Sequence, residues 1–166
     1  MIDIMKMFID FLYTLVIGAA VAVFVGLGIW TFYSEPKMPT YPDYPQTIYD
    51  ASGSIVQDKT YQTRLDKYNQ AVDKYNNSQK SYDKKVATLA LMASVIFYVA
   101  GLWLMKKIDV VGEGLALGGA FTGIYAAVRA GMGDSKQFVF AIVGVLLVMV
   151  VVLSIHRRRP PQTAKY

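Results

Sequence analysis

The sequence predicts an all-α integral membrane protein with four transmembrane helices and one polar insert between the first two. The chain has 166 residues, of which 54% are hydrophobic, and a mean hydropathy of +0.33. Such a composition is too apolar for a soluble domain unless the apolar residues are clustered. They form four nearly uncharged stretches of about 18 to 23 residues, each long enough to cross about 30 Å of hydrocarbon as a helix. These spans are predicted at residues 11–33, 86–105, 110–128 and 138–155.

Residues 1–33 comprise a short amino terminus and the first span. The apolar run from Phe11 exceeds the ~7 to 15 residues of a signal-peptide core, so we expect it to remain as a membrane anchor. The residues before it, Met1 to Asp10, are expected to lie at the membrane interface.

The polar insert, residues 34–85, contains two regular repeats. Its prolines recur every three residues, which is the repeat of a polyproline II helix. These prolines are Pro36, Pro39, Pro42 and Pro45. Downstream, tyrosines recur every seven residues with one further residue between each pair, which marks a stripe along an α-helix. This tyrosine stripe comprises Tyr61, Leu65, Tyr68, Val72, Tyr75, Gln79, Tyr82 and Val86. The two repeats predict a stalk in which a polyproline segment folds back along an α-helix, and that helix continues without proline or glycine into the second span.

The lengths of the two repeats agree closely enough for the segments to pack together. Three residues of polyproline II span ~9.3 Å, and seven residues of α-helix span ~10.5 Å. A second apolar face of the proline segment carries Met38, Tyr41 and Tyr44. Two alternatives stay open. In the first, the stripe pairs with another copy of the chain as a coiled coil. In the second, the helix is simply solvated. The e and g positions of such a coiled coil would be mostly small and uncharged, which favours the hairpin within one chain.

In shape, this hairpin resembles the polyproline-and-helix fold of the pancreatic-polypeptide hormones and the stalks of some bacterial adhesins. The resemblance covers about 50 residues. It implies a shape and carries no function.

The basic residues set the predicted orientation in the membrane. The termini and the turn at 106–109 hold seven Lys and Arg in about 25 residues, whereas the insert and the connection after the third span hold ten in about 61. The higher density favours cytoplasmic termini and an extracytoplasmic insert, although the lysines at 84–85 argue for the reverse. The basic tail, residues 156–166, is expected to bind anionic lipid headgroups. Its arginines are Arg157, Arg158 and Arg159.

Small residues follow one face of two spans, at the spacing that lets membrane helices approach closely. In the first span these are Gly18, Ala22 and Gly26. In the third span they are Gly112, Ala116, Gly119, Ala120, Gly123 and Ala127. We expect them to pack within one bundle. The alternatives are an interface between subunits and room for a pore helix to move.

Two charged residues belong to the third span and its end. Glu113 sits about one turn inside, and an intramembrane carboxylate is costly enough to suggest a function. Anchoring at the interface and a role in ion or proton movement both stay open. Arg129, ~24 Å further along the helix, is expected to extend toward the headgroups, in the direction of Asp134.

The residues indicate a non-enzymatic protein. The chain has no cysteine, and its one histidine, His156, stands beside arginines with no nearby carboxylate or nucleophile. We find no catalytic, cofactor-binding or metal-binding motif, and expect neither nucleic acid nor a small-molecule substrate as a partner. The leading expectation is a membrane scaffold, adhesion or accessory subunit whose tyrosine-rich stalk binds a protein partner or further copies of the chain. The alternative is a small oligomeric channel or transporter that uses the third span and Glu113.

Overall fold

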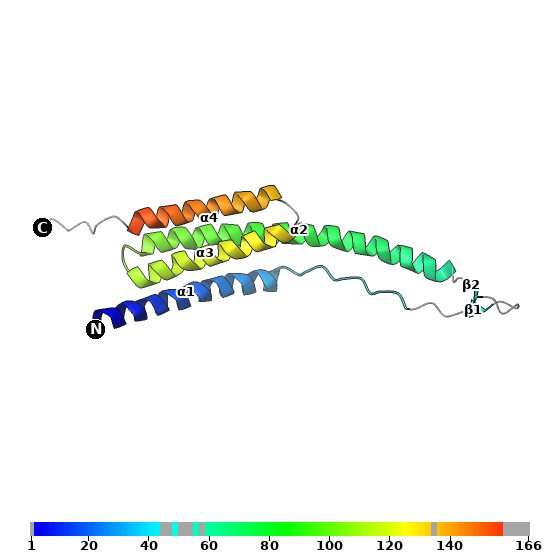
Figure 1. The fold of residues 1–166 in the computed structure, drawn as a ribbon, viewed down its shortest axis with the longest axis horizontal. Helices are drawn as coiled ribbons and strands as arrows, with labels where there is room; N and C mark the ends of the chain where they lie inside the picture. Colours follow the sequence, from blue (N-terminus) through cyan, green and yellow to red (C-terminus); the bar gives the residue numbers. More distant parts are fainter. Residues whose placement is uncertain (1, 44–47, 50–54, 57–58, 134–135, 158–166) are drawn as a thin grey trace. The chain divides into compact units, whose positions relative to one another are not determined.

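Helices make up most of the computed structural model, which describes residues 2–43, 48–49, 55–56, 59–133 and 136–157 (Figure 1). Over these residues the helices are α1 (Ile2–Phe32), α2 (Lys59–Leu104), α3 (Asp109–Met132) and α4 (Lys136–Arg157). Two short strands, β1 (Ile48–Tyr49) and β2 (Ile55–Val56), pair antiparallel, with Ile48 opposite Val56. Each of the four helices is long and apolar enough to cross a membrane, which confirms the predicted helical class with four candidate spans.

The helices extend beyond the predicted spans. α1 starts at Ile2, so residues 2–10 are helical and continuous with the first span. No proline or glycine precedes Gly18, and so nothing in this stretch terminates a helix. α2 is one continuous helix of 46 residues, and it contains no proline and no glycine before Gly101. α3 and α4 each extend slightly past both predicted ends.

The chain divides into two compact units. The bundle unit comprises Met1–Ser34 and Asp83–Tyr166, and the insert unit comprises Glu35–Tyr82. α2 therefore contributes residues 59–82 to the insert unit and 83–104 to the bundle unit.

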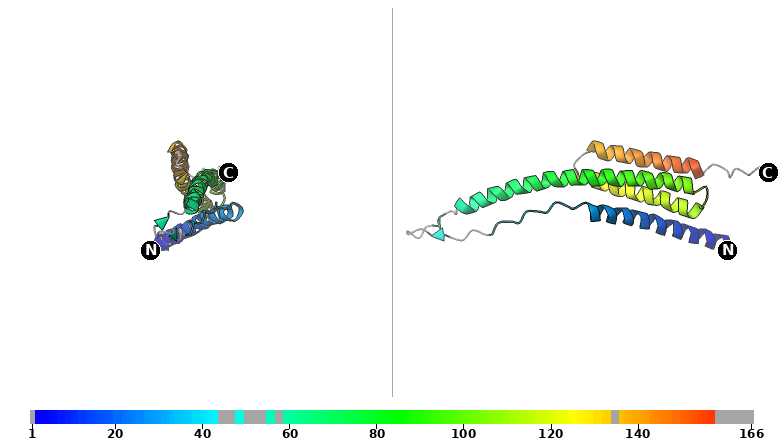
Figure 2. Two further views of the ribbon diagram at one scale, coloured as in Figure 1. Left: turned by 90° about the vertical axis from the view of Figure 1, so that its right-hand side faces the viewer. Right: turned by 180° about the vertical axis from the view of Figure 1, so that it is seen from behind.

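Within the bundle unit, α3 packs closely on α1 (Figures 1 and 2). A Cβ atom added at Gly114 or Gly118 would lie 2.7 or 2.6 Å from the nearest α1 side-chain atom, which shows that only glycine fits at these two positions. On α1, a Cβ at Gly18 would lie 3.2 Å from Leu117, whereas one at Gly26 would meet nothing within 4 Å. The predicted small-residue face of the first span therefore contacts α3 at Gly18 but not at Gly26.

The other face of α3 packs on α2. A Cβ at Gly119 would lie 2.7 Å from the carbonyl oxygen of Ser94 and 2.8 Å from the backbone nitrogen of Tyr98. The Ser94 hydroxyl donates a hydrogen bond of 2.7 Å to the carbonyl of Gly119, and the Tyr98 hydroxyl donates one to the carbonyl of Met149 on α4. The predicted small-residue face of the third span thus packs within the chain, as expected.

Small side chains also predominate in one buried cluster of the bundle, whereas many large side chains lie outside. One buried cluster joins α2, α3 and α4 and consists of Ala87, Ala90, Ala126, Ala130 and Ile142. By contrast, Phe24 on α1 and Phe140 on α4 are 72% and 81% exposed. A helix bundle in lipid has this arrangement, because hydrocarbon solvates large apolar side chains and close helix contacts need small ones.

Candidate functional site

In the insert unit, burial follows the spacing of the two repeats. Pro36, Pro39 and Pro42 are partly buried, and the residues between them are exposed. On α2, the partly or fully buried positions are those of the tyrosine stripe and Ala71, namely Tyr61, Leu65, Tyr68, Ala71, Val72, Tyr75, Gln79 and Tyr82. Two further residues of the predicted stalk surface, Tyr44 and Pro45, lie outside the described residues.

Side-chain contacts between described residues join the segment after α1 to the helix of the insert unit. The rings of Tyr41 and Tyr68 meet edge to face, with centroids 5.0 Å apart and an interplanar angle of 71°. The hydroxyls of Tyr41 and Tyr61 lie 3.3 Å apart, within hydrogen-bonding distance. Near the start of the segment, Nε2 of Gln79 donates a hydrogen bond of 3.0 Å to Oε1 of Glu35. Tyrosine and amide side chains therefore hold the segment on the helix, and no feature of the sequence pointed to Glu35.

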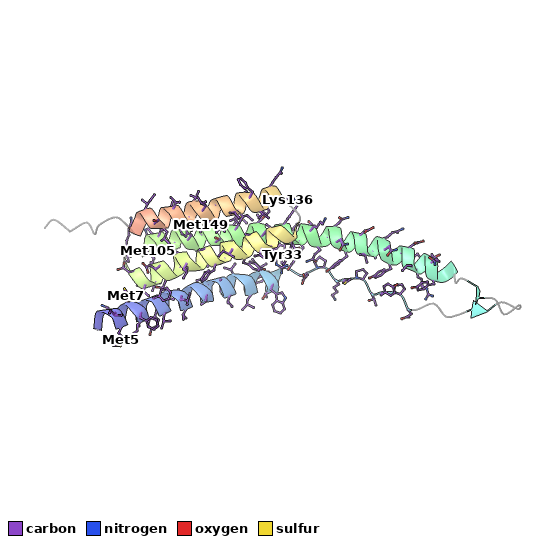
Figure 3. The ribbon with its side chains drawn as sticks, viewed as in Figure 1. Met5, Met7, Tyr33, Met105, Lys136 and Met149 are labelled. Atoms are coloured by element: carbon purple, nitrogen blue, oxygen red, sulfur yellow. The ribbon has the colours of Figure 1, made fainter. Side chains whose placement is uncertain are left out.

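A cavity of about 510 Å³ lies in the bundle unit, at the end where α1 and α3 begin and α2 and α4 end. Its walls come from α1, α3, α4 and the residue that follows α2. The lining residues are Lys6, Met7, Asp10, Phe11, Thr14, Met105, Glu113, Leu117 and Leu153. Figure 3 places Met7 and Met105 at this end of the unit and Lys136 at the other. The volume is in the range of about 300 to 1,000 Å³ that small-ligand sites occupy.

Three ionisable side chains, Lys6, Asp10 and Glu113, line this otherwise mostly apolar cavity. Lys6, Asp10 and Thr14 follow at four-residue intervals, so they share one face of α1. Beside Glu113, Gly114 lets α3 approach α1, since a Cβ there would lie 3.3 Å from the carbonyl oxygen of Thr14. The sequence pointed to Glu113 alone, because Lys6 and Asp10 were assigned to an interfacial segment. Their regular spacing within an apolar helix was the signal that could have found them.

Arg129 forms an ion pair with Asp83 of α2. One guanidinium nitrogen, Nη1, lies 2.9 Å from Oδ1 of Asp83, whose side chain is only 4% exposed. Arg129 Nε also donates a 3.3 Å hydrogen bond to the hydroxyl of Tyr125, one helical turn earlier. Asp134, the predicted neighbour, lies outside the described residues. The antiparallel arrangement of α2 and α3 places the end of α3 beside the residues that precede the second span, and hydropathy alone does not specify that these two helices are neighbours.

Basic residues lie at the ends of two spans. The Lys107 ammonium is 4.8 Å from the centroid of the Trp103 ring, a cation–π contact at the end of α2. Paired aromatic and basic residues are typical of membrane–water interfaces. Arg157 is the last residue of α4. The other two arginines of the tail, Arg158 and Arg159, lie outside the described residues.

Within the described part of the chain, no group of three or more His, Asp or Glu side chains could hold a metal ion. Comparison with protein-family models, curated proteins and solved structures finds no match to this chain.

Proposed function

We propose that this protein is a non-enzymatic membrane scaffold, adhesion or accessory subunit whose insert unit binds a protein partner. The observation that carries the proposal is the environment of Tyr41. Its ring contacts Tyr68 and its hydroxyl approaches Tyr61, yet Tyr41 is 52% exposed. Met38, one repeat earlier, is 66% exposed. An aromatic side chain held in place by its neighbours and still exposed can enter a pocket of a partner at little cost in conformational entropy.

The proposal includes a polyproline II conformation for the proline segment and its packing along α2. Burial at every third residue from Pro36 to Pro42 supports it, because polyproline II repeats every ~3 residues. The contacts of Glu35 and Tyr41 with α2 support the hairpin over the coiled coil between copies, since they occupy positions on the stripe side of the helix. A complex with further copies of the chain would then use the exposed face around Met38.

The proposed orientation places the termini in the cytoplasm and the insert unit outside. The density of Lys and Arg in the termini and in the turn between α2 and α3 supports it. The arginines of the tail would bind anionic headgroups on the cytoplasmic side.

A crosslinking experiment in intact cells tests partner binding. A photoreactive amino acid replaces Met38 in the full chain, and in a matched control it replaces Asp66, an exposed residue of α2 outside the tyrosine stripe. We expect one defined protein adduct from position 38, identified by mass spectrometry, and little from position 66. An adduct with a second copy of the chain would assign the surface to self-association. The same set of adducts from both positions, or none from position 38, would contradict the proposal.

A second candidate function is a small oligomeric channel or transporter that uses α3 and Glu113. The cavity lined by Lys6, Asp10 and Glu113 favours it, because ionisable groups inside a membrane bundle often mark a path for ions or protons. The opposite face of α3 weakens it, since glycines pack there directly against the backbone of α2 and leave no room for a path on that side.

A further inference from the structure

The cavity at the start of α1 and α3 combines charged and apolar walls in a way that selects one class of ligand. We propose that it binds the headgroup of a phospholipid that carries a primary ammonium group, with phosphatidylethanolamine as the representative. The lipid phosphate would lie at Lys6, and its ammonium group would lie between Asp10 and Glu113. This inference does not depend on the function proposed for the insert unit.

The charges in the cavity match this headgroup better than they match other common ones. A primary ammonium group has three N–H donors, and charge-assisted hydrogen bonds to carboxylates are among the strongest in proteins. A choline headgroup has the same charges but no N–H donor, so it cannot form these bonds. A phosphatidylglycerol headgroup is anionic without a compensating cation, and the two carboxylates, Asp10 and Glu113, would repel it.

The position of the cavity along the helices suits a lipid headgroup. Lys6 and Glu113 each lie four residues from the start of their helix, and Leu153 lies four residues before the end of α4. Each of these distances is ~6 Å along the helix axis. The apolar part of α1, Ile4–Phe32, has 29 residues and is therefore ~43 Å long, which exceeds the ~30 Å of hydrocarbon. The first turns of α1 can thus lie among headgroups while the rest of the helix crosses the bilayer.

The cavity can be reached from the lipid side of the bundle. Met7 and Phe11 belong to its lining, and both are largely exposed, at 69% and 60%. Leu117 and Leu153 add apolar surface. A phospholipid could therefore place its headgroup against the charged residues and its acyl chains along Met7 and Phe11, without any opening of the helix bundle.

Native mass spectrometry of the full-length protein tests the assignment. The protein is extracted in detergent and exposed to equal amounts of phosphatidylethanolamine, phosphatidylcholine and phosphatidylglycerol with identical acyl chains. We expect bound phosphatidylethanolamine to exceed each of the other two by about tenfold or more, the factor that one charge-assisted hydrogen bond supplies. In Asp10→Asn and Glu113→Gln this preference should fall several-fold. In Lys6→Gln, binding of the ethanolamine and choline lipids should fall together, because both share the phosphate.

The matched control is Asp109→Asn, which removes the same charge one turn before Glu113, from an exposed residue outside the cavity lining. It should keep the full preference. Helix content, measured by circular dichroism, identifies variants that fail to fold. Lipid binding is compared only among folded variants of the set Lys6→Gln, Asp10→Asn and Glu113→Gln. Equal binding of the three lipids to the unmutated chain overturns the proposal. So does a preference that survives both Asp10→Asn and Glu113→Gln, and so does equal binding of the ethanolamine and choline lipids.

Discussion

The two units of this chain hold their segments together with opposite kinds of side chain. In the bundle unit, α2 and α3 meet at Gly119, Ser94 and Tyr98 with almost no side-chain volume between their backbones. In the insert unit, the contacts between the proline segment and the helix come from large, partly polar residues, Tyr41 against Tyr61 and Tyr68.

The solvent accounts for this difference. In lipid, burying an apolar side chain gains little, because the acyl chains are equally apolar, so close packing and hydrogen bonds between helices hold the bundle. In water, burying the face of an aromatic ring is itself favourable, and the tyrosine hydroxyl can keep a polar contact at the edge. A change of side-chain size should therefore have opposite consequences in the two units.

The ion pair of the bundle unit should give the largest effect. Arg129→Gln leaves the nearly buried Asp83 carboxylate without its cation, and we expect a loss of about 3 kcal/mol in the free energy of unfolding. Asp83→Asn should cost less, because the Arg129 side chain is 23% exposed and can reach water. Reversible unfolding in mixed detergent micelles measures both, with the exposed Asp73→Asn as the control. Equal losses of less than about 0.5 kcal/mol in both variants would show that close packing alone holds α2 and α3 together.

A glycine pair tests close packing directly. Gly119→Ala places a methyl group against the backbone of Ser94 and Tyr98, so we expect a loss of about 1 to 3 kcal/mol. Gly26→Ala meets no atom within 4 Å and should instead stabilise the helix by about 0.5 to 1 kcal/mol. The same unfolding measurement compares them. A destabilising Gly26→Ala would indicate that this face of α1 contacts another copy of the chain.

In the insert unit, the removal of large side chains should be the damaging change. Tyr68→Ala combined with Tyr75→Ala removes two rings of the tyrosine stripe, and the contact of Tyr68 with Tyr41 alone is worth about 0.5 to 1.5 kcal/mol beyond the area it buries. Hydrogen exchange over residues 59–82 should therefore become faster. Asp66→Ala combined with Asp73→Ala changes exposed residues of the same helix and should leave exchange nearly unaltered. Equal exchange in the two double variants would remove the support for a packed hairpin.

The features that could be predicted from the sequence are those that a single segment encodes. Four apolar stretches predicted four spans, and the absence of proline and glycine before Gly101 predicted that α2 would continue unbroken into the second span. The contact of Arg129 with Asp83 and the cavity at Lys6, Asp10 and Glu113 depend on which helices are neighbours, and hydropathy does not specify that. The small residues of the third span predicted one closely packed face of α3. They did not predict the second closely packed face, where Gly114 and Gly118 contact α1.

The smallest effect is expected from Glu113→Gln on ion movement, where scaffold and channel make different predictions. If the bundle only supports the insert unit, reconstituted vesicles should show no ion or proton flux above empty vesicles, with or without the substitution. If the cavity lies on a conduction path, the unmutated protein must conduct, and loss of the Glu113 charge must alter selectivity or pH dependence, because a charge inside a low-dielectric path changes the barrier directly. We expect no flux, because glycine contacts close α3 against α2 with no space left between the helices. A conductance of the purified protein that changes on Glu113→Gln would make the channel the better description and would place the ion path on the α1 side of α3, where the cavity lies.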